Sequence, residues 1–180
     1  MELLNFATKH NYFWFQGQFF SQVKGVAMGA KYAPSLANLF MAQWEEDVVD
    51  TPRRPELVLW ARYIDDILLL WKGTRESLDS FMSFLNDNDR GIVLSYEASS
   101  TSIHFLDLEI LAIDGHFEFK TYFKPTDRNG YIPVDSCHYH QWLRSVPQGQ
   151  FLRMKRNCTR REDFDSQCQI LKKRFLDKGY

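Results

Sequence analysis

The sequence predicts an α+β fold, in which an antiparallel sheet is packed by helices and followed by a small C-terminal helical segment. Three observations predict it. Two apolar runs within residues 58–71 flank a short polar stretch, which is typical of a β-hairpin with buried strands. Apolar residues in 75–86 recur at helical spacing. Residues 149–178 have the composition of two further helices joined by a short turn near Thr159.

Composition sets the broad class. With 180 residues, of which 44% are hydrophobic and 16% aromatic, the chain can form one domain with a sizeable core. No apolar run is long enough for a transmembrane helix, so we expect no membrane partner. The first residues lack the basic and apolar regions of a signal peptide. Three cysteines, an odd number, suggest reduced thiols in an intracellular protein.

Charge is distributed unevenly along the chain. Residues 1–119 hold 9 basic and 17 acidic side chains, whereas residues 120–180 hold 13 basic and 6 acidic ones. A basic final third on an acidic body suits a polyanion held near carboxylates. An ordinary charged helical surface explains the same counts, and the two interpretations stay open.

The N-terminal elements come first in chain order. Residues 2–8 have the pattern of a helix end. Residues 11–15 and 18–22 are predicted to form an aromatic-rich hairpin that turns at Gln16-Gly17. We expect its aromatic side chains in the core rather than on a base-stacking surface.

A glycine-containing loop and a helix follow within residues 24–44. Gly25 and Gly29, four apart, allow close approach of another chain or ligand. Pro34 suits the first turn of a helix. The helix is expected to bury one face, formed by Leu36, Leu39, Phe40 and Trp44. Taken alone, the glycine pair is better explained as a flexible connection, because no P-loop Lys-Ser/Thr pair accompanies it.

After a loop at residues 50–55, the predicted hairpin of residues 58–71 places Asp65 and Asp66 at its turn. Two adjacent carboxylates repel each other unless a cation lies beside them. Mg²⁺ commonly binds one or two carboxylates together with phosphates and water. Aspartate is also a common turn residue, so on this stretch alone a metal site and a plain β-turn are equally good explanations.

The next elements are a helix, a strand and a second hairpin. Thr74 is a suitable N-cap for a helix over residues 75–86. Residues 92–96 are predicted to be a strand, and residues 103–113 and 116–123 a hairpin around Asp114-Gly115. The helix is expected to bury Leu78, Phe81, Met82 and Leu85.

In that second hairpin, Asp107 and Glu109 are expected to share a strand face. They could join a metal site, but an exposed face explains them more simply. The strand over residues 116–123 mixes aromatic and charged residues, which predicts that the face with Glu118 and Lys120 is wet.

Residues 124–147 are predicted to be irregular because prolines and a glycine interrupt them. They contain Cys137, His138 and His140, whose spacing matches no standard zinc pattern, so zinc is the minor interpretation. Helices are expected over residues 149–158 and 161–178, in a helix-turn-helix-like unit. No face for base-specific reading stands out, which favours contact with the nucleic-acid backbone. The residues expected to make it are Arg153, Lys155, Arg156, Lys172, Lys173 and Arg174.

The order of these motifs resembles the palm of a reverse transcriptase. Gly25 to Gly29, then Pro34 and Asn38, resemble the family's loop and helix that contact template and nucleotide, and Tyr63-Ile64-Asp65-Asp66 resembles its metal-binding turn. Four sequence strings are similar to those of Penelope-like retroelements: AMGxxxxPSLANLFM, RYIDDI, FLDLEI and KPTDRNxYIPxDSCH. Phe105 to Leu108 lie where the primer-supporting hairpin region begins. The final helices resemble the start of the thumb, also classed as an animal helix-turn-helix region.

The resemblance implies RNA-directed DNA polymerisation across two Mg²⁺ (or Mn²⁺) ions, with an RNA template, a DNA primer and dNTPs as partners. Asp65 would be the principal metal ligand and Asp66 a secondary one. Tyr63, Gly25, Met28, Gly29, Pro34 and Asn38 would contact nucleotide or template. The family also needs an aspartate on a strand several dozen residues before the glycine loop, and this sequence does not contain it. We therefore expect the chain alone to polymerise little or nothing.

The resemblance also implies two segments, a partial palm at 1–123 and a linker with thumb-like helices at 124–180, in a nuclear or cytoplasmic protein. The alternative is a non-catalytic, retroelement-derived protein that binds nucleic acid through the basic helices. A third possibility is an unstable remnant without function. The oligomeric state stays open.

Overall fold

A computed structural model describes residues 2–50 and 54–180. The chain divides into two compact units, Met1–Val93 and Leu94–Tyr180. This division does not coincide with the boundary expected at 123/124, which concerned family segments and stays a prediction. Among the described residues, no helix is both long and apolar enough to cross a lipid bilayer.

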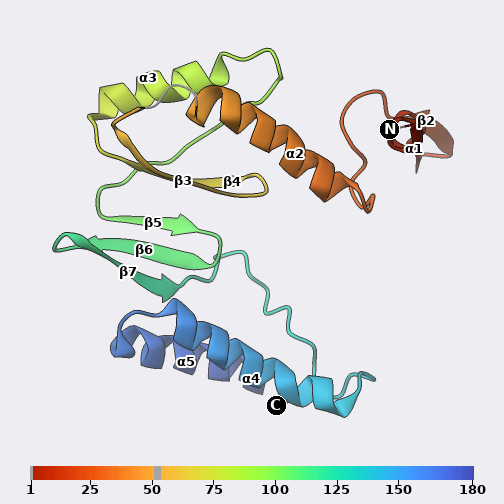
Figure 1. Cartoon of the computed structure of the whole chain (residues 1–180). Coiled ribbons are helices and arrows are strands. Elements are labelled where there is room, and N and C mark those ends of the chain that lie inside the picture. Colours follow the sequence, from red (N-terminus) through yellow and green to blue (C-terminus); the bar gives the residue numbers. More distant parts are fainter. Residues whose placement is uncertain (1, 51–53) are drawn as a thin grey trace. The chain divides into compact units, whose positions relative to one another are not determined.

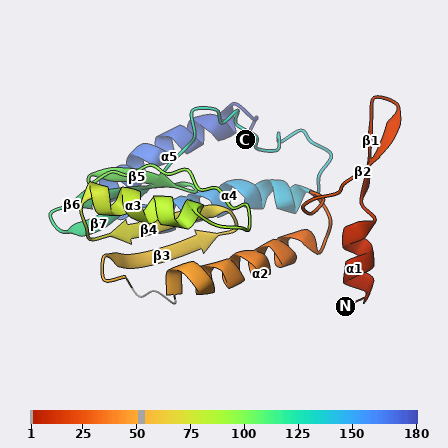
Figure 2. The same ribbon diagram turned by 90° about the horizontal axis from the view of Figure 1, so that it is seen from above.

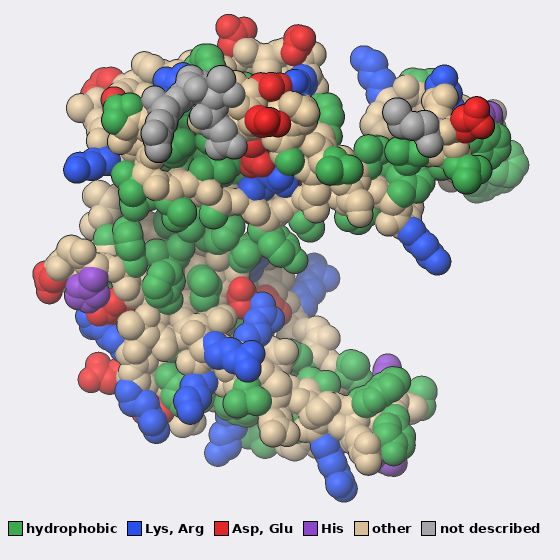
Figure 3. Space-filling view, in the orientation of Figure 1, with side chains coloured by type: hydrophobic (Ala, Val, Ile, Leu, Met, Phe, Trp, Pro, Cys, Tyr) green, Lys and Arg blue, Asp and Glu red, His purple; other side chains and the backbone are tan. Residues whose placement is uncertain are grey.

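The first unit begins with helix α1 (Glu2–Lys9) and the hairpin of β1 (Tyr12–Phe15) and β2 (Gln18–Ser21). The turn at Gln16-Gly17 is confirmed, with both residues at positive φ. The expectation that its aromatic side chains are buried is wrong: Trp14 is 60% and Phe19 75% exposed. Among the described residues, the two strands pair only with each other, and all their side chains are exposed. Figure 3 shows hydrophobic side chains gathered over this hairpin.

Helix α2 (Ala33–Glu45) starts at the position that Pro34 predicted and continues into a short π-helix, η1 (Glu46–Asp50). The buried face expected along α2 is largely wrong, because only its C-terminal end is covered. Trp44 is 1% exposed, whereas Leu39 is 69% and Phe40 47% exposed, and Leu36 is half-buried. Of the loop expected at 50–55, residue 50 ends η1 and residues 51–53 lie outside the described part.

Strands β3 (Leu57–Tyr63) and β4 (Asp66–Trp71) form the predicted hairpin, and Tyr63 pairs with Asp66. The expectation of strands buried on both faces is wrong, since most of these side chains are half-buried and Val58 is 56% exposed. The physical reason is that, within the part of the chain that the structure describes, this sheet has only two strands, so both are edge strands. Helices α2 and α3 lie against this hairpin (Figures 1 and 2), through Trp44 near Trp60 and Phe81 stacked on Trp71.

Helix α3 (Arg75–Asn86) confirms its sequence pattern in full. The Thr74 side chain accepts a hydrogen bond from the Ser77 amide, which satisfies one of the free amides of the first turn. All four residues expected in the core are buried: Leu78, Phe81, Met82 and Leu85.

The strand predicted at residues 92–96 is wrong, because this segment has no regular secondary structure. The side chain of Asn88 explains part of this. Its amide donates to the Ile92 carbonyl at 2.8 Å, and its oxygen accepts from the Ile92 amide at 3.1 Å. Ile92 therefore bonds back to the end of α3 instead of to a neighbouring strand.

The second unit contains a three-stranded antiparallel sheet in the order β5 (Ser102–Phe105), β6 (Leu108–Ile113) and β7 (His116–Thr121). The turn at Asp114-Gly115 is confirmed. The single strand expected over 103–113 is wrong, because the chain turns at Leu106-Asp107 and splits it into β5 and β6. Asp107 consequently lies in a turn and not on the same strand face as Glu109, which pairs with Lys120 at 3.1 Å.

Strand β7 also differs from its prediction. The face with Glu118 and Lys120 was expected to be wet, yet Glu118 is 6% exposed while Phe117 is 47% exposed. The cause is a distant arginine, since Arg160 donates to the Glu118 carboxylate at 2.8 Å. An ion pair of this kind removes the main cost of covering a carboxylate.

Two helices complete the second unit, α4 (His140–Asn157) and α5 (Arg161–Leu176). The helix pair is confirmed, but α4 begins nine residues before the predicted start. Pro147 lies inside it, where the irregular segment was expected to continue. Proline in a helix removes one hydrogen bond, here the one to the Leu143 carbonyl. Leu143, which is 3% exposed, anchors the turn that precedes this defect.

Candidate nucleic-acid interface

The helix pair α4–α5 is built on a small apolar core. Met154 of α4 packs with Leu171 and Phe175 of α5, and all three are buried. Around them lie partly buried side chains from both helices and from the segments before, between and after them: Phe123, Tyr131, Val146, Phe151, Cys158, Phe164, Cys168 and Tyr180. The core fixes which side of each helix faces solvent.

The turn between the helices is tied to the sheet. The Thr159 amide donates to the Phe119 carbonyl at 2.8 Å, and the Phe119 amide donates to the Thr159 hydroxyl at 3.0 Å. Arg160 in the same turn reaches Glu118. The hydrogen bond from Arg160 lowers the pKa of the Glu118 carboxyl, so this carboxylate stays charged. The turn between α4 and α5 thus attaches the helix pair to β7.

Two of the six basic residues expected to contact nucleic acid are engaged within the protein. Arg153 is 2.6 Å from the Asp107 carboxylate, and Arg174 is 2.7 Å from Asp127. The Arg174 guanidinium also lies 4.0 Å from the centre of the Phe123 ring, and its side chain is 17% exposed. Arg174 therefore contributes to the fold through Asp127 and Phe123, and its predicted contact with nucleic acid stays a prediction.

The other four residues keep their charge available. Lys155 and Arg156 lie at the C-terminal end of α4, and Lys172 and Lys173 near the end of α5, all with exposed side chains. Within residues 2–50 and 54–180, none of the four forms an ion pair. Figure 3 shows basic side chains exposed around this helix pair. Unpaired cations on a rigid helix pair can each neutralise a phosphate.

The N-terminal half of α5 has the opposite character. Glu162, Asp163 and Asp165 lie in its first turns, where negative charge is favoured by the helix dipole. In a DNA-reading helix-turn-helix, the N-terminal residues of the second helix contact base edges in the major groove. If the first turns of α5 entered the major groove, their carboxylates would approach the DNA phosphates and be repelled. The start of α5 therefore differs in charge from the start of a base-reading second helix.

The predicted metal turn lies in the first unit, at the end of the β3–β4 hairpin. Tyr63, Asp65 and Asp66 are exposed there. Ile64 has φ +60°, a strained value for a β-branched residue. The β5–β6 turn repeats this arrangement, with Leu106 at φ +56° followed by Asp107. Strain of this kind often occurs at functional sites, but it does not define one.

Arg62 holds the Tyr63–Asp66 turn against α2. Its guanidinium donates to both carboxylate oxygens of Glu45, at 2.8 and 2.9 Å. It also donates to the Ile64 carbonyl and to the Asn38 side-chain oxygen, each at 3.0 Å. Burial raises the pKa of Glu45, but the hydrogen bonds from Arg62 and Trp60 outweigh it and hold that pKa below its usual value. Arg62 thus links Asn38 of α2 to the Tyr63–Asp66 turn.

The remaining residues predicted to contact nucleotide or template lie before and at the start of α2. Gly25 and Gly29 have positive φ in an exposed loop, which accounts for glycine at both positions. Met28 is fully exposed, and Pro34 lies in the first turn of the helix. Their contacts with nucleotide or template stay predictions.

The donor set does not fit a complete metal centre. In the described part of the chain, no three His, Cys, Asp or Glu side chains are grouped so that they could hold a metal ion. Asp65 and Asp66 supply two neighbouring carboxylates, whereas two-metal chemistry needs more ligands. Near the minor zinc candidate, Cys137 is an exposed free thiol, and His138 contacts the Ser136 hydroxyl at 2.5 Å.

Sequence reasoning missed a pocket in the second unit. Its polar lining includes Lys124, Gln150 and Tyr131, together with Asp107 and Arg153. Gln150 belongs to no motif, and Lys124 begins the KPTDRNxYIPxDSCH string, for which no role was predicted. The two residues come together only when the β5–β6 turn, the segment after β7 and α4 are assembled. The KPTDRNxYIPxDSCH string was the available signal, since it contains Lys124 and Tyr131.

Comparison with known proteins supports the helical segment. A family model described as an animal helix-turn-helix domain matches residues 130–180, which include all of α4 and α5. The predicted similarity of this segment to that class is confirmed. No curated protein and no solved structure matches the chain. The match does not extend to residues 1–129, so the reverse-transcriptase resemblance of that region stays a prediction.

Proposed function

We propose that this protein binds nucleic acid through its C-terminal helix pair, by contacts with the phosphate backbone and without base-specific reading. One observation carries the proposal. Lys155, Arg156, Lys172 and Lys173 are exposed and lack ion-pair partners in the described chain, while neighbouring arginines are paired. The match of residues 130–180 to a helix-turn-helix family supports it.

The test is the salt dependence of binding to duplex DNA, measured by fluorescence anisotropy. If four cations each neutralise one phosphate, the logarithm of affinity falls with the logarithm of salt with a slope of about −3.6. The double variant Lys155→Gln/Arg156→Gln should reduce the slope by about 1.8. Duplexes of unrelated sequence should bind with similar affinity, because base edges are not read.

A matched control removes two exposed lysines from the other unit, Lys9→Gln/Lys72→Gln. This variant has the same change in net charge and should leave the slope unchanged. Equal effects of the two double variants would show that binding follows net charge rather than the helix pair, and would contradict the proposal.

We propose a reverse-transcriptase palm fragment as the second candidate function. The exposed Tyr63-Ile64-Asp65-Asp66 turn, with Arg62 linking it to Asn38, favours this candidate. Bound Mg²⁺ ions would supply electrostatic stabilisation for nucleotidyl transfer, with Asp65 and Asp66 as ligands. Because the described residues contain no third grouped carboxylate, the chain is expected to have little or no polymerase activity.

This candidate is tested by incorporation of dNTPs on a primed RNA template with Mg²⁺ or Mn²⁺, compared with Asp65→Ala. Robust incorporation by the 180-residue chain that is lost in the variant would contradict the expected inactivity and establish the polymerase. Absence of activity after fusion to an aspartate-bearing upstream strand would reject the polymerase assignment.

A further inference from the structure

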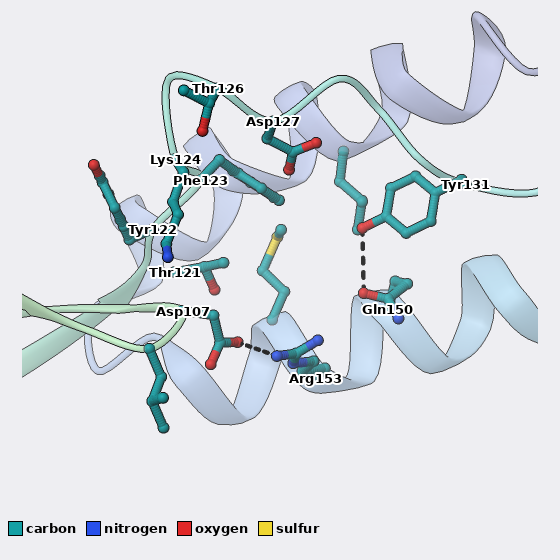
Figure 4. A pocket seen from close by; sticks show the side chains of 13 residues that line it. Asp107, Thr121, Tyr122, Phe123, Lys124, Thr126, Asp127, Tyr131, Gln150 and Arg153 are labelled. Atoms are coloured by element: carbon teal, nitrogen blue, oxygen red, sulfur yellow. Dashed lines mark hydrogen bonds and ion pairs between the residues drawn. The ribbon is translucent and has the colours of Figure 1, made fainter. Parts of the chain in front are cut away.

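A pocket of ≈ 350 Å³ lies in the second unit, among the β5–β6 turn, the segment after β7 and the helices α4 and α5 (Figure 4). This volume is at the lower end of the range for small-ligand sites. One part of the lining is apolar, with Leu106, Phe123 and Met154. Hydroxyl, amide and charged groups form the rest. Such a mixture suits a flat ligand with one polar end.

The charges in the pocket favour an anion. Asp107 is neutralised by Arg153 and also accepts from the Asn157 side chain at 3.0 Å. Asp127 is neutralised by Arg174. Lys124, in contrast, forms no ion pair within the described residues, and its side chain extends into the pocket. Counting Arg174, which pairs with Asp127 but does not line the pocket, these five side chains carry one net positive charge.

Arg153 adds further donors. It contacts Asp107 through one terminal nitrogen, and a guanidinium carries five N–H groups, so donors remain for a second anion. Its side chain is 55% exposed and thus accessible. The sequence alone already predicted that Arg153 contacts a phosphate, and the pocket supplies a place where it can do so together with Lys124.

The opposite side of the pocket is ordered before any ligand arrives. Arg174 lies over the Phe123 ring and is itself held by Asp127. The Tyr131 hydroxyl donates to the Gln150 side-chain oxygen at 3.2 Å, which leaves the Gln150 amide free to donate. Burial raises the pKa of Tyr131, so its hydroxyl remains a donor at neutral pH. Preformed walls reduce the entropy cost of binding.

We propose that this pocket binds one unpaired nucleotide, with its phosphate at Lys124 and Arg153 and its base against Leu106, Phe123 and Met154. The choice of a nucleotide over other flat anions rests on the proposed nucleic-acid function. A divalent cation is a poor alternative, because both carboxylates of the lining are already neutralised by arginines. With such a pocket, the helix pair would hold a single-stranded or terminal nucleotide in addition to the backbone.

The test is calorimetric titration of the whole chain with adenosine 5′-monophosphate at low salt. Lys124→Met should weaken binding about tenfold, because it removes a charge-assisted contact to the phosphate. Thr126→Trp should abolish binding by filling the pocket, since Thr126 is an exposed lining residue. Arg128→Met is the matched control: Arg128 is an exposed cation on the same segment that does not line the pocket, and its loss should change affinity less than twofold.

Three results would overturn the proposal: no binding of adenosine 5′-monophosphate, equal affinity for inorganic phosphate, or equal effects of Lys124→Met and Arg128→Met. Circular dichroism of each variant establishes that it is folded. The two measurements distinguish failure of the pocket proposal from failure of the proposed function. Loss of nucleotide binding with intact salt-dependent duplex binding rejects the pocket alone, and the reverse result rejects the backbone contacts of Lys155 and Arg156.

Discussion

Replacing Leu171 by alanine should destabilise the second unit. Leu171 is fully buried, between Met154 of α4 and Phe175 of α5, so the substitution leaves a cavity at the centre of the helix pair. Leucine-to-alanine changes at such sites cost about 3 kcal/mol, which raises the equilibrium for opening of the unit about 150-fold. The exposed cations of the proposed interface depend on this core for their relative positions.

The matched control lies five residues further along the same helix. Leu176 is 59% exposed, and Leu176→Ala should cost less than about 0.5 kcal/mol. Hydrogen exchange measured by mass spectrometry on peptides from α4 and α5 gives the loss of opening free energy in each variant. These peptides report on the second unit alone. Equal protection in Leu171→Ala and Leu176→Ala would refute the packing of the helix pair described above.

Two further predictions concern a carboxylate and a turn. Glu118→Gln should destabilise the second unit at neutral pH, because the Arg160 contact that lowers the pKa of Glu118 is lost. The folded pKa lies below the unfolded value of about 4.3. The difference in unfolding free energy between the two proteins is therefore full above about pH 5 and vanishes as the pH falls through the folded pKa. Thermal unfolding at pH 3 to 7 checks it, and a pH-independent difference between the two proteins would contradict it. Ile64→Gly should leave stability unchanged or raise it by up to about 1 kcal/mol, because Ile64 has φ +60° and is 44% exposed. Chemical denaturation with Ile67→Gly as the destabilising control measures this, and a clear loss of stability in Ile64→Gly would show that the side chain, not the backbone, determines the turn.

Structural elements that are stabilised by residues close to each other in the sequence could be predicted from the sequence. The N-cap hydrogen bond of Thr74 and the buried stripe of α3 involve residues within a few positions of each other, so their spacing contains the necessary information. The same holds for the turns at Gln16-Gly17 and Asp114-Gly115, where backbone conformation selects the residues. The segment 92–96 could not be predicted, because the side chain of Asn88 competes with strand pairing for the backbone of Ile92.

The candidate interface was only partly predictable. Six basic residues were expected to contact nucleic acid, and composition gave no reason to separate them. Arg153 and Arg174 differ from the others because of acidic partners 46 and 47 positions away along the chain, at Asp107 and Asp127. Such pairs depend on where a sheet turn and a loop meet the helices, and a single sequence does not encode that in any local pattern.

By itself, the sequence determined the class of fold, the helix pair with its basic character, and the Tyr63–Asp66 hairpin, because periodicity, capping and turn chemistry act over short distances. Only the tertiary structure decided which cations remain free, why Glu118 is covered, and that Lys124 and Arg153 line one pocket. These properties arise from contacts between segments distant in the chain. Their electrostatic consequences depend on burial and on the nearest charge, which are set only when the segments are assembled.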